Sequence, residues 1–436
     1  MHAYSHREAI IFRNETVTYH ALLERYVQWK RLLTEEGVQP GQVAALVGTY
    51  SPSLCGAFLA LLDNGNTIVP MSPEGDVRQK EQLRIAHVEV VFTLDGRSCQ
   101  TVHLQQGARP PMLQKLADSG RPGMILFTSG TTGEPKAIVH DMIKFTERYK
   151  TPRDTLRTLS FLRFDHIGGM NTLLHTLANG GSVVCPDKLL PGDICALIEH
   201  YKIELLPTSP SFLNLLLVTE VYQQYDLSSL KLITYGTEVM PEYTLQRLRR
   251  AFPGVQFRQT YGLSEVGILR AKSMSSDSLL FKVGGEGVEV KVRDGILYIR
   301  SQTAMEGYLN APDPFDEDGW LNTQDQVVQE GEFIRIIGRK SEIINVGGQK
   351  VYPAEVEEVL LQMPEVRDVT VRGEPNVLLG NIVTATVNLE MDIHTAELKQ
   401  RIKEFCADKL EGYQIPVKIY MEQSELYSDR FKKIRS

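Results

Sequence analysis

The sequence has few cysteines, no long hydrophobic run and no excess of basic residues. Its five cysteines are scattered, odd in number and free of C-x-x-C spacing, which argues against a disulfide framework and a zinc site. No apolar stretch approaches the roughly 20 residues of a membrane-spanning helix, and the first residues lack the pattern of a secretory signal. The formal net charge of -7 disfavours general nucleic-acid binding. These absences favour a cytoplasmic protein with reduced cysteines.

What the sequence does contain is an alternation of apolar strand-like runs and amphipathic helical stretches. Thr18 is placed to cap a helix that ends near Gly37, and an apolar run at 43–47 follows it. A helical stretch at 51–62 and a strand-like run at 67–70 continue the alternation. Similar strand-like runs return at 183–184, 205–207 and 232–235. The pattern predicts α/β sheets with largely parallel strands.

The pattern changes twice toward the C-terminus. Residues 281–328 alternate apolar and polar side chains between glycine turns, which indicates a small antiparallel β region. After Lys340 the chain predicts a compact α+β module that begins with a helix at 353–360. At 436 residues the chain exceeds what one core usually supports. We therefore predict a large N-terminal domain at 1–339 and a small C-terminal domain at 340–436.

The strongest local motif is a loop of hydroxyls and glycines that follows an apolar run at 125–127 and closes on a lysine. Small residues let backbone N–H groups approach phosphate oxygens, while hydroxyls and an ammonium add donors. The motif is not the Walker G-x-x-x-x-G-K-[ST] sequence. A short Gly-Thr-Thr-Gly by itself is typical of a surface turn, but the longer string is more specific. Its candidate phosphate-binding residues are Thr128, Ser129, Gly130, Thr131, Thr132, Gly133 and Lys136.

This string resembles the phosphate loop of the adenylate-forming superfamily, which includes acyl- and aryl-CoA ligases, peptide-synthetase adenylation domains and firefly luciferase. Segment 259–265 resembles the family's Q-x-Y-G-x-T-E motif, with serine replacing threonine. The resemblance implies that Tyr261 stacks on adenine beside Gly262, that Ser264 hydrogen-bonds near the α-phosphate, and that Glu265 holds Mg²⁺. A carboxylate oxygen is the hard ligand that Mg²⁺ prefers.

Two further segments match the nucleotide side of the family. Gly236, Thr237 and Glu238 occupy the place of its adenine-side loop. Segment 318–325 resembles D-G-W-x-x-T-G-D, with Gln324 in place of the usual glycine, which leaves the turn geometry there open. The resemblance implies that Asp325 accepts hydrogen bonds from the ribose.

The resemblance implies that the C-terminal domain is mobile, and the end of the chain carries the motifs of that domain. The resemblance implies that Arg339 contacts ribose and phosphate, that Ser341 lies at the hinge, and that the loop of Gly347 and Gly348 enters the site for thioester formation. Adjacent glycines suit a backbone that must approach a substrate closely. Segment 426–434 resembles the terminal L-P-R-T-x-x-G-K-I in degraded form. Lys433 takes the place of the lysine that contacts the carboxylate and α-phosphate, and Lys432 is near enough for the register to slip by one.

The acyl-binding region is the least informative part of the sequence. Segment 164–171 resembles the H-x-G-G-x-N segment of acyl-CoA ligases, in which the histidine lies near the carboxylate. His166 would therefore contact or gate the acyl site, unless it is a packing histidine. Amino-acid adenylation domains place an aspartate nearby for the substrate ammonium, so Asp165 leaves an amino acid open as substrate.

The resemblance covers almost the whole chain and is closest to acyl- or aryl-CoA ligases. It implies ATP and Mg²⁺ as cofactors and activation of a small carboxylic acid as acyl-AMP. The acyl group would then pass to coenzyme A or, alternatively, to the phosphopantetheine of an acyl or peptidyl carrier protein. Two other interpretations stay open. Gly262 to Gly267 reads G-x-S-x-x-G, one residue longer than a hydrolase elbow, and the degraded terminal segment allows a nucleotide binder without catalysis.

Overall fold

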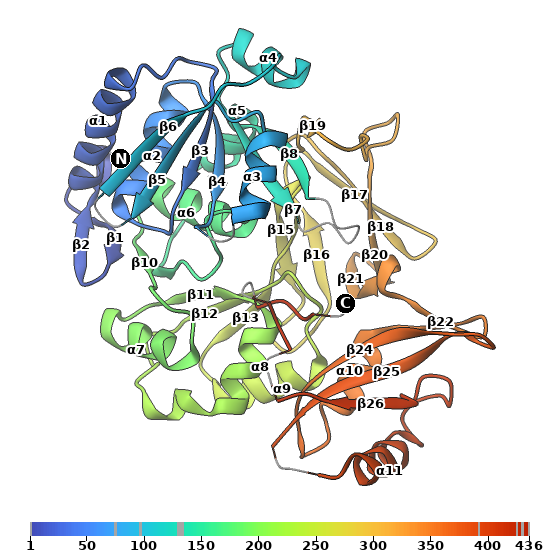
Figure 1. Cartoon of the computed structure of the whole chain (residues 1–436). Coiled ribbons are helices and arrows are strands. Elements are labelled where there is room, and N and C mark those ends of the chain that lie inside the picture. Colours follow the sequence, from blue (N-terminus) through green and yellow to red (C-terminus); the bar gives the residue numbers. More distant parts are fainter. Residues whose placement is uncertain are drawn as a thin grey trace.

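A computed structural model describes residues 2–73, 76–95, 98–128, 135–390, 393–423, 426–428 and 431–434. Four sheets organise the chain, three in an N-terminal part and one in a C-terminal module (Figure 1). All five cysteines are free thiols. Within the ranges given above, no helix combines the length and the apolar character that crossing a membrane requires.

The first sheet has a parallel centre and antiparallel edges. Its seven strands run in the order β19-β8-β7-β4-β3-β5-β6. The strands are β3 (Val43–Val47), β4 (Thr67–Met71), β5 (Val90–Asp95), β6 (Ser98–His103), β7 (Gly123–Thr128), β8 (Lys136–Asp141) and β19 (Gly307–Tyr308). Every residue of β3 is buried, as the continuous apolar run predicts for a strand covered on both faces.

The second sheet is parallel except for its edge hairpin. Its strand order is β13-β12-β11-β9-β10-β1-β2. The strands are β1 (Glu8–Phe12), β2 (Glu15–Thr18), β9 (Thr158–Leu159), β10 (Val183–Cys185), β11 (Leu205–Thr208), β12 (Leu232–Tyr235) and β13 (Gln256–Gln259). Only β1 and β2 pair antiparallel in this sheet.

Helices fill the space between these two sheets and cover their outer faces. One apolar core joins both sheets through α1 (Tyr19–Glu35), α2 (Pro52–Asp63) and α6 (Ile167–Ala178). Residues of α3 (Asp76–Ile85) and α4 (Pro111–Asp118) pack on the other face of the first sheet. The other face of the second sheet carries α7 (Pro191–Tyr201), α8 (Pro210–Thr219) and α9 (Glu242–Ala251). The result is a layered α/β architecture.

Local sequence signals explain the helix ends. The Thr18 hydroxyl accepts a hydrogen bond from the backbone N–H of Ala21 and so caps α1. Gly37 has a φ of 68°, which lets the chain turn away after that helix. Ser51 caps α2 in the same way, with Pro52 in the first turn. The predicted helix and strand boundaries in this part are confirmed to within a residue or two.

The third sheet is the predicted antiparallel β region. Its strand order is β14-β15-β16-β21-β20-β18-β17. The strands are β14 (Tyr261–Leu263), β15 (Gly267–Ser273), β16 (Phe281–Gly284), β17 (Val288–Arg293), β18 (Ile296–Ser301), β20 (Leu321–Glu330) and β21 (Phe333–Arg339). Short helical segments accompany the N-terminal part: η1 (His2–Tyr4), α5 (Met142–Thr146), η2 (Glu147–Tyr149) and η3 (Val221–Gln224).

The C-terminal module has its own sheet and its own core. After η4 (Lys340–Glu342), it contains β22 (Ile344–Val346), β23 (Gln349–Val351), α10 (Pro353–Leu360), β24 (Val366–Asn376), β25 (Gly380–Leu389), α11 (Thr395–Cys406) and β26 (Lys418–Met421). Its apolar core is drawn almost entirely from these elements. The strands of the third sheet end at Arg339 and those of the fourth begin at Ile344, so the predicted boundary at 339/340 falls between two sheets.

Polar contacts join the module to the N-terminal part. The backbone N–H of Tyr243 donates to the Glu358 carboxylate at 2.7 Å, and the Asn214 amide donates to the Arg367 carbonyl at 3.1 Å. Apolar packing joins them as well, since the Phe431 ring lies against Phe161 and Phe212.

Candidate active site

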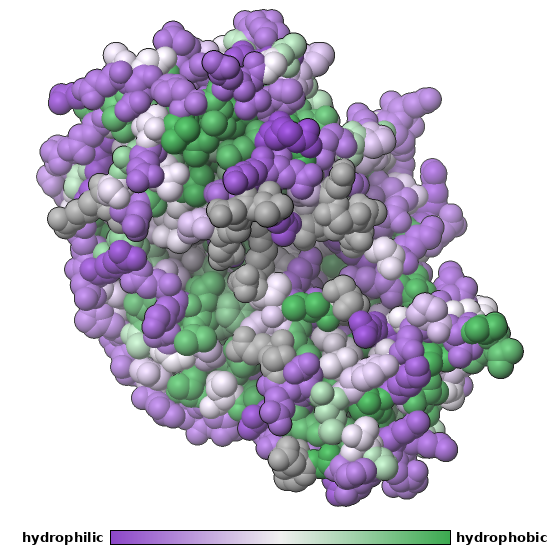
Figure 2. Space-filling model, in the orientation of Figure 1, coloured by the Kyte–Doolittle hydropathy of each residue, from purple (hydrophilic) through white to green (hydrophobic). Residues whose placement is uncertain are grey.

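A cleft of about 640 Å³ lies where the first three sheets meet the C-terminal module. Its lining includes residues at or just after the carboxyl ends of parallel strands: Thr128 at the end of β7, Thr208 at the end of β11, Gly236 after β12 and Thr260 after β13. Ligands of open α/β sheets bind at that edge. The volume lies in the ordinary range of a small-molecule site, about 300–1,000 Å³. In Figure 2 this part of the surface is hollowed between the upper and lower halves of the molecule.

The two ends of the predicted phosphate loop line this cleft. Thr128 and Lys136 are partners across the β7–β8 pair, and both contribute to the lining. Asn310 clamps the start of β8, since its side chain accepts from the Ala137 N–H at 2.9 Å and donates to the Pro135 carbonyl at 2.9 Å. The predicted residues between the two ends lie outside the described residues; they are Ser129, Gly130, Thr131, Thr132 and Gly133.

The predicted Mg²⁺ ligand is held in the same lining. Glu265 and Ser264 follow β14, in the tight turn before β15. The Tyr308 hydroxyl donates to Glu265 Oε1 at 2.6 Å, and burial together with the Glu265 charge raises the Tyr308 pKa, so this hydroxyl keeps its proton. A single carboxylate suits an Mg²⁺ ion that takes its other ligands from phosphates and water. Among the described residues there is no cluster of three or more acidic, His or Cys groups fit to hold a metal without such help.

His140 supports this turn from β8. Its Nε2 donates to the Ser264 carbonyl oxygen at 2.7 Å. Burial lowers the His140 pKa to about 4, so the ring is neutral at pH 7. Because Nε2 donates to the backbone carbonyl, this nitrogen is not available as a base for the Ser264 hydroxyl. Among the described residues, no histidine is hydrogen-bonded to that hydroxyl, so the nucleophile–base pair of a serine hydrolase is not seen there.

Asp325 is a buried carboxylate beside Arg339, which lines the cleft. Its side chain is 7% exposed and accepts from the Tyr261 hydroxyl at 2.6 Å and from Arg339 Nε at 3.0 Å. Burial alone would lower the Arg339 pKa, but the charge and hydrogen bond of Asp325, together with the nearby Tyr261 and Glu342, outweigh it, so the guanidinium pKa is raised. Arg339 lines the cleft, and Asp325 adjoins it through that pair.

Tyr261 has a different surrounding from the one its predicted role suggests. Its ring packs in the apolar core of the third sheet, 6.0 Å from the Phe281 ring, and it is not among the cleft-lining residues. Gly262 next to it does line the cleft. The position takes glycine because a Cβ there would lie 2.6 Å from the Gly267 carbonyl oxygen. Stacking of Tyr261 on adenine stays a prediction. The contact seen here is its hydrogen bond to Asp325.

Gln324 lies within β20, where the pairing with β18 shifts register between Asn322 and Gln326. Its φ is 61°, in the left-handed region that side chains other than glycine seldom enter. The Asn322 side chain accepts a hydrogen bond from the Gln324 N–H at 3.0 Å and stabilises this irregularity. Gln324 therefore adopts a backbone geometry that suits glycine, at the cost of some strain.

The predicted adenine-side loop is split between two cavities. Gly236 and Thr237 line the cleft. A Cβ on Gly236 would lie 2.5 Å from the Thr260 hydroxyl, so the close approach requires glycine. The Glu238 carboxylate turns away from the cleft and accepts from the Ser211 hydroxyl at 2.6 Å.

His166 lies in the cleft lining at the start of α6. Its Nδ1 accepts from the Gly168 N–H at 3.1 Å and caps the helix. Gly169 allows the preceding loop to cross this helix end, because a Cβ there would lie 2.0 Å from the Arg163 carbonyl. Asp165 also lines the cleft, with Arg163 Nε 3.6 Å away. An aspartate beside an arginine is a poor partner for a substrate ammonium.

Three predicted residues of the C-terminal module lie outside the cleft lining. Gly347 and Gly348 form the exposed β22–β23 turn, with φ values of 57° and 89°. The β24–β25 hairpin ends beside them, since the Gly347 N–H donates to the Leu379 carbonyl; this apolar tip is green at the right edge of the module in Figure 2. Lys433 lines a second cavity between the module and α8. The predicted roles of these three residues stay predictions.

Sequence reasoning missed His140, Tyr308 and Asn310. His140 contacts Ser264 across 124 positions of the chain, and Tyr308 contacts Glu265 across 43. Asn310 contacts Ala137, the neighbour of Lys136, across 173 positions. In the sequence they are marked only by lying in or next to short strand-like runs, β8 for His140 and β19 for Tyr308 and Asn310.

Comparison with known proteins identifies the architecture. The model of the AMP-binding enzyme family matches residues 1–309, and that of the AMP-binding enzyme C-terminal domain matches residues 355–430. The chain is similar to an indoleacetate–CoA ligase of Aromatoleum aromaticum, 31% identical over 61% of this chain and 57% of that relative. It is also similar to a long-chain-fatty-acid–CoA ligase of Bacillus subtilis, 24% identical over 98% of this chain and 90% of the relative.

A solved structure shares the whole fold. The anthranilate CoA ligase AuaEII in complex with anthranoyl-AMP superposes with a TM-score of 0.82 over 99% of this chain and 93% of the other, at 20% identity. At that identity the likeness concerns the fold alone. With family models matching most of its length, the chain belongs to the AMP-binding enzyme family, as the resemblance of its motifs predicted.

Proposed function

We propose that this protein converts a small carboxylic acid and ATP into acyl-AMP and pyrophosphate, and then transfers the acyl group to the thiol of coenzyme A. One observation carries the proposal. Both ends of the phosphate loop, the Ser264–Glu265 turn, Arg339 and His166 line one cleft. The cleft thus combines donors for phosphates, a carboxylate for a hard cation and a ribose-side charge pair.

The chemistry explains this combination. A carboxylate becomes electrophilic when it attacks the α-phosphorus of ATP, displaces pyrophosphate and forms a mixed anhydride. The reacting groups are all anionic, so catalysis depends on positioning and charge stabilisation. Thr128 and Lys136 would direct the phosphates, and Ser264 would donate near the α-phosphate. Mg²⁺ held at Glu265 would neutralise part of the phosphate charge.

The remaining residues would fix the nucleotide and the acid. Asp325 would accept from the ribose hydroxyls, with Arg339 and Tyr261 holding its carboxylate in place. Gly236, Thr237 and Gly262 would leave room for the base, and His166 would lie at the acid. We propose 1–339 and 340–436 as the two domains, with the second turning about Ser341 between half-reactions so that Gly347 and Gly348 face the thiol.

Coenzyme A is favoured over a carrier protein as the acceptor. The curated relatives described above are named as CoA ligases. Aryl and fatty acids are the substrate classes that their names indicate. The Arg163–Asp165 pair favours these classes over an amino acid.

The test is ATP–pyrophosphate exchange across a panel of aryl, fatty and amino acids, followed by addition of coenzyme A to the positives. We expect exchange with at least one aryl or fatty acid and thioester formation on adding coenzyme A. ATP binding without exchange for any acid would show a non-catalytic nucleotide binder. Acyl-AMP that reacts only with a phosphopantetheinylated carrier would establish the alternative acceptor.

A further inference from the structure

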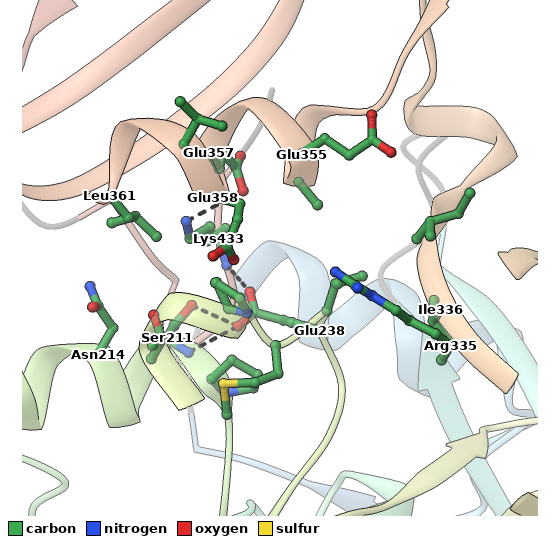
Figure 3. Close-up of a pocket in the computed structure, with 18 of the residues that line it drawn as sticks. Ser211, Asn214, Glu238, Arg335, Ile336, Glu355, Glu357, Glu358, Leu361 and Lys433 are labelled. Carbon is green, nitrogen blue, oxygen red and sulfur yellow. Dashed lines mark hydrogen bonds and ion pairs between the residues drawn. The ribbon is translucent and has the colours of Figure 1, made fainter. Parts of the chain in front are cut away.

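Two adjacent lysines near the C-terminus lie in different cavities. Lys432 lines the nucleotide cleft together with Ser264, Glu265 and Arg339. Lys433 lines the second cavity, of about 460 Å³, between α8, the loop after β12 and α10 (Figure 3). Lys433 forms an isolated antiparallel bridge with Tyr427, and the side chains of the two neighbouring lysines enter different cavities. In this structure, of the two, Lys432 faces the cleft.

The Lys433 ammonium is bound by buried groups of the C-terminal module. Its Nζ donates to the Val369 carbonyl at 2.7 Å and lies 3.4 Å from Glu357 and 3.5 Å from Asp368. The Lys433 and Glu357 side chains are 9% and 3% exposed. Moving this ammonium into the cleft would leave a buried carboxylate without its counter-ion, which is strongly unfavourable.

The backbone of Lys433 is also fixed, on the N-terminal side of the same cavity. Its N–H donates to Glu238 Oε1 at 2.5 Å, and Glu238 is held by the hydroxyl and the N–H of Ser211. Figure 3 shows Glu238 and Glu357 approaching Lys433 from opposite sides. The residue therefore links the two domains.

Phe431 sets the register of the two lysines. Its φ of 48° belongs to a turn closed by its N–H on the Ser428 carbonyl at 2.7 Å. Its ring is buried against Phe161 and Phe212, with ring centroids 5.3 Å away in each case. Phe161 and Phe431 both line the cleft, so this anchor holds the next side chain, Lys432, at the cleft wall.

From this geometry we propose that Lys432 is the catalytic lysine of adenylate formation, in contact with the acid carboxylate and the α-phosphate, and that Lys433 is a structural residue that joins the two domains. The proposal rests on the proposed function. It shifts by one residue the assignment that the terminal motif implies. The ammonium of Lys432 would stabilise the negative charge that develops on the α-phosphate as the carboxylate attacks.

The experiment compares Lys432→Ala and Lys433→Ala in the full chain. ATP–pyrophosphate exchange is measured with the best acid of the panel, and thioester formation is measured separately from supplied acyl-AMP and coenzyme A. We expect Lys432→Ala to lower kcat for exchange about 100-fold with a normal thermal midpoint and a normal thioester rate. Lys432→Arg should recover part of the loss because the charge is kept.

Lys433→Ala should lower the thermal midpoint. Its kcat for exchange should stay at least about tenfold higher than that of Lys432→Ala. Because that variant could unfold, the triple variant Lys433→Met with Glu357→Gln and Asp368→Asn replaces the ammonium and both carboxylates by neutral groups and should restore the midpoint. Exchange lost to the same extent in the folded triple variant as in Lys432→Ala would overturn the proposal, as would normal exchange in Lys432→Ala.

Failure of the proposed function gives a different result. If no acid supports exchange in the wild type, the function is wrong, and the lysine assignment is then judged by calorimetric titration with MgATP. Weaker binding in Lys432→Ala than in Lys433→Ala would support a cleft role for Lys432. The reverse order would contradict it.

Discussion

The nucleotide cleft and the glycine turn of the C-terminal module are built in opposite ways. In the cleft, Glu265 is held by Tyr308, and Asp325 by both Tyr261 and Arg339. At the turn, Gly348 is exposed, and a Cβ on it would meet nothing within 4 Å. A site that binds the same nucleotide in each turnover gains from groups fixed in advance. A loop that acts in only one of two half-reactions gains from having few contacts to break.

Among the substitutions that test the hydrogen-bonded carboxylates of the cleft, Asp325→Ala is expected to have the largest effect. It removes the proposed ribose acceptor and also leaves the Tyr261 hydroxyl and Arg339 without their shared partner. We expect ATP affinity to fall about 100-fold, or about 3 kcal/mol, measured by calorimetric titration. Asp325→Asn is the matched control and should lose less, because one oxygen still accepts. Unchanged nucleotide affinity in the alanine variant would remove Asp325 from the ribose site.

The folded protein should lose stability in acid because of His140, which holds the Ser264–Glu265 turn. Its folded-state pKa of about 4 lies below the ordinary value of 6.5. The unfolded chain therefore binds more protons between these pH values, so stability is complete above pH 6.5 and declines as pH falls toward 4. The difference corresponds to about 3 kcal/mol of unfolding free energy. His140→Gln should flatten this decline in urea titrations, whereas His20→Gln, at an exposed residue, should keep the wild-type slope. Parallel curves for wild type and His140→Gln would exclude this explanation.

The exposed β22–β23 turn of the C-terminal module can be tested by substituting Gly348. Gly348→Val should slow thioester formation from supplied acyl-AMP at least about tenfold, because the side chain both strains a φ of 89° and blocks a close approach. Exchange should be unaffected. Gly331→Val is the matched control, since Gly331 also has a positive φ and open space but lies in the β20–β21 turn. A normal thioester rate in Gly348→Val would refute the role of this turn.

The smallest effect is expected at Gln324. Gln324→Gly should relieve the left-handed backbone and raise the unfolding free energy by about 0.5–1 kcal/mol. Gln326→Gly, in the interior of β20, should lower it by a similar amount. The measurement is the urea midpoint of each variant. Equal destabilisation by both substitutions would mean that the backbone at Gln324 holds no strain that glycine can relieve.

Most of the fold could be predicted from the sequence because its signals are local. Thr18 and Ser51 cap helices through hydrogen bonds to residues three positions away, and the apolar run at 43–47 is a strand buried on both faces. Periodicity and capping need no knowledge of distant contacts. The order in which strands pair is different, since β1 lies between β2 and β10 through contacts the pattern does not encode.

The candidate site was predicted less completely, for the same reason. Motif order brought Thr128, Lys136, Ser264, Glu265 and Arg339 to attention, and all five line one cleft. His140 and Tyr308 could not be found, because their role depends on which strand the folded chain places next to Glu265. The lysines differ by a single position, and only the turn at Phe431 decides which one faces the cleft.

The buried ring of Phe431 has a consequence for the timing of the two half-reactions. Any rotation that carries the C-terminal segment away must extract this ring from between Phe161 and Phe212 and expose it to water, at a cost of about 2 kcal/mol. Phe161 belongs to the cleft wall, so whatever fills the cleft competes for the same apolar surface. The cost of exposing this ring therefore adds to the barrier of any such rotation, and it can differ between an empty and a filled cleft.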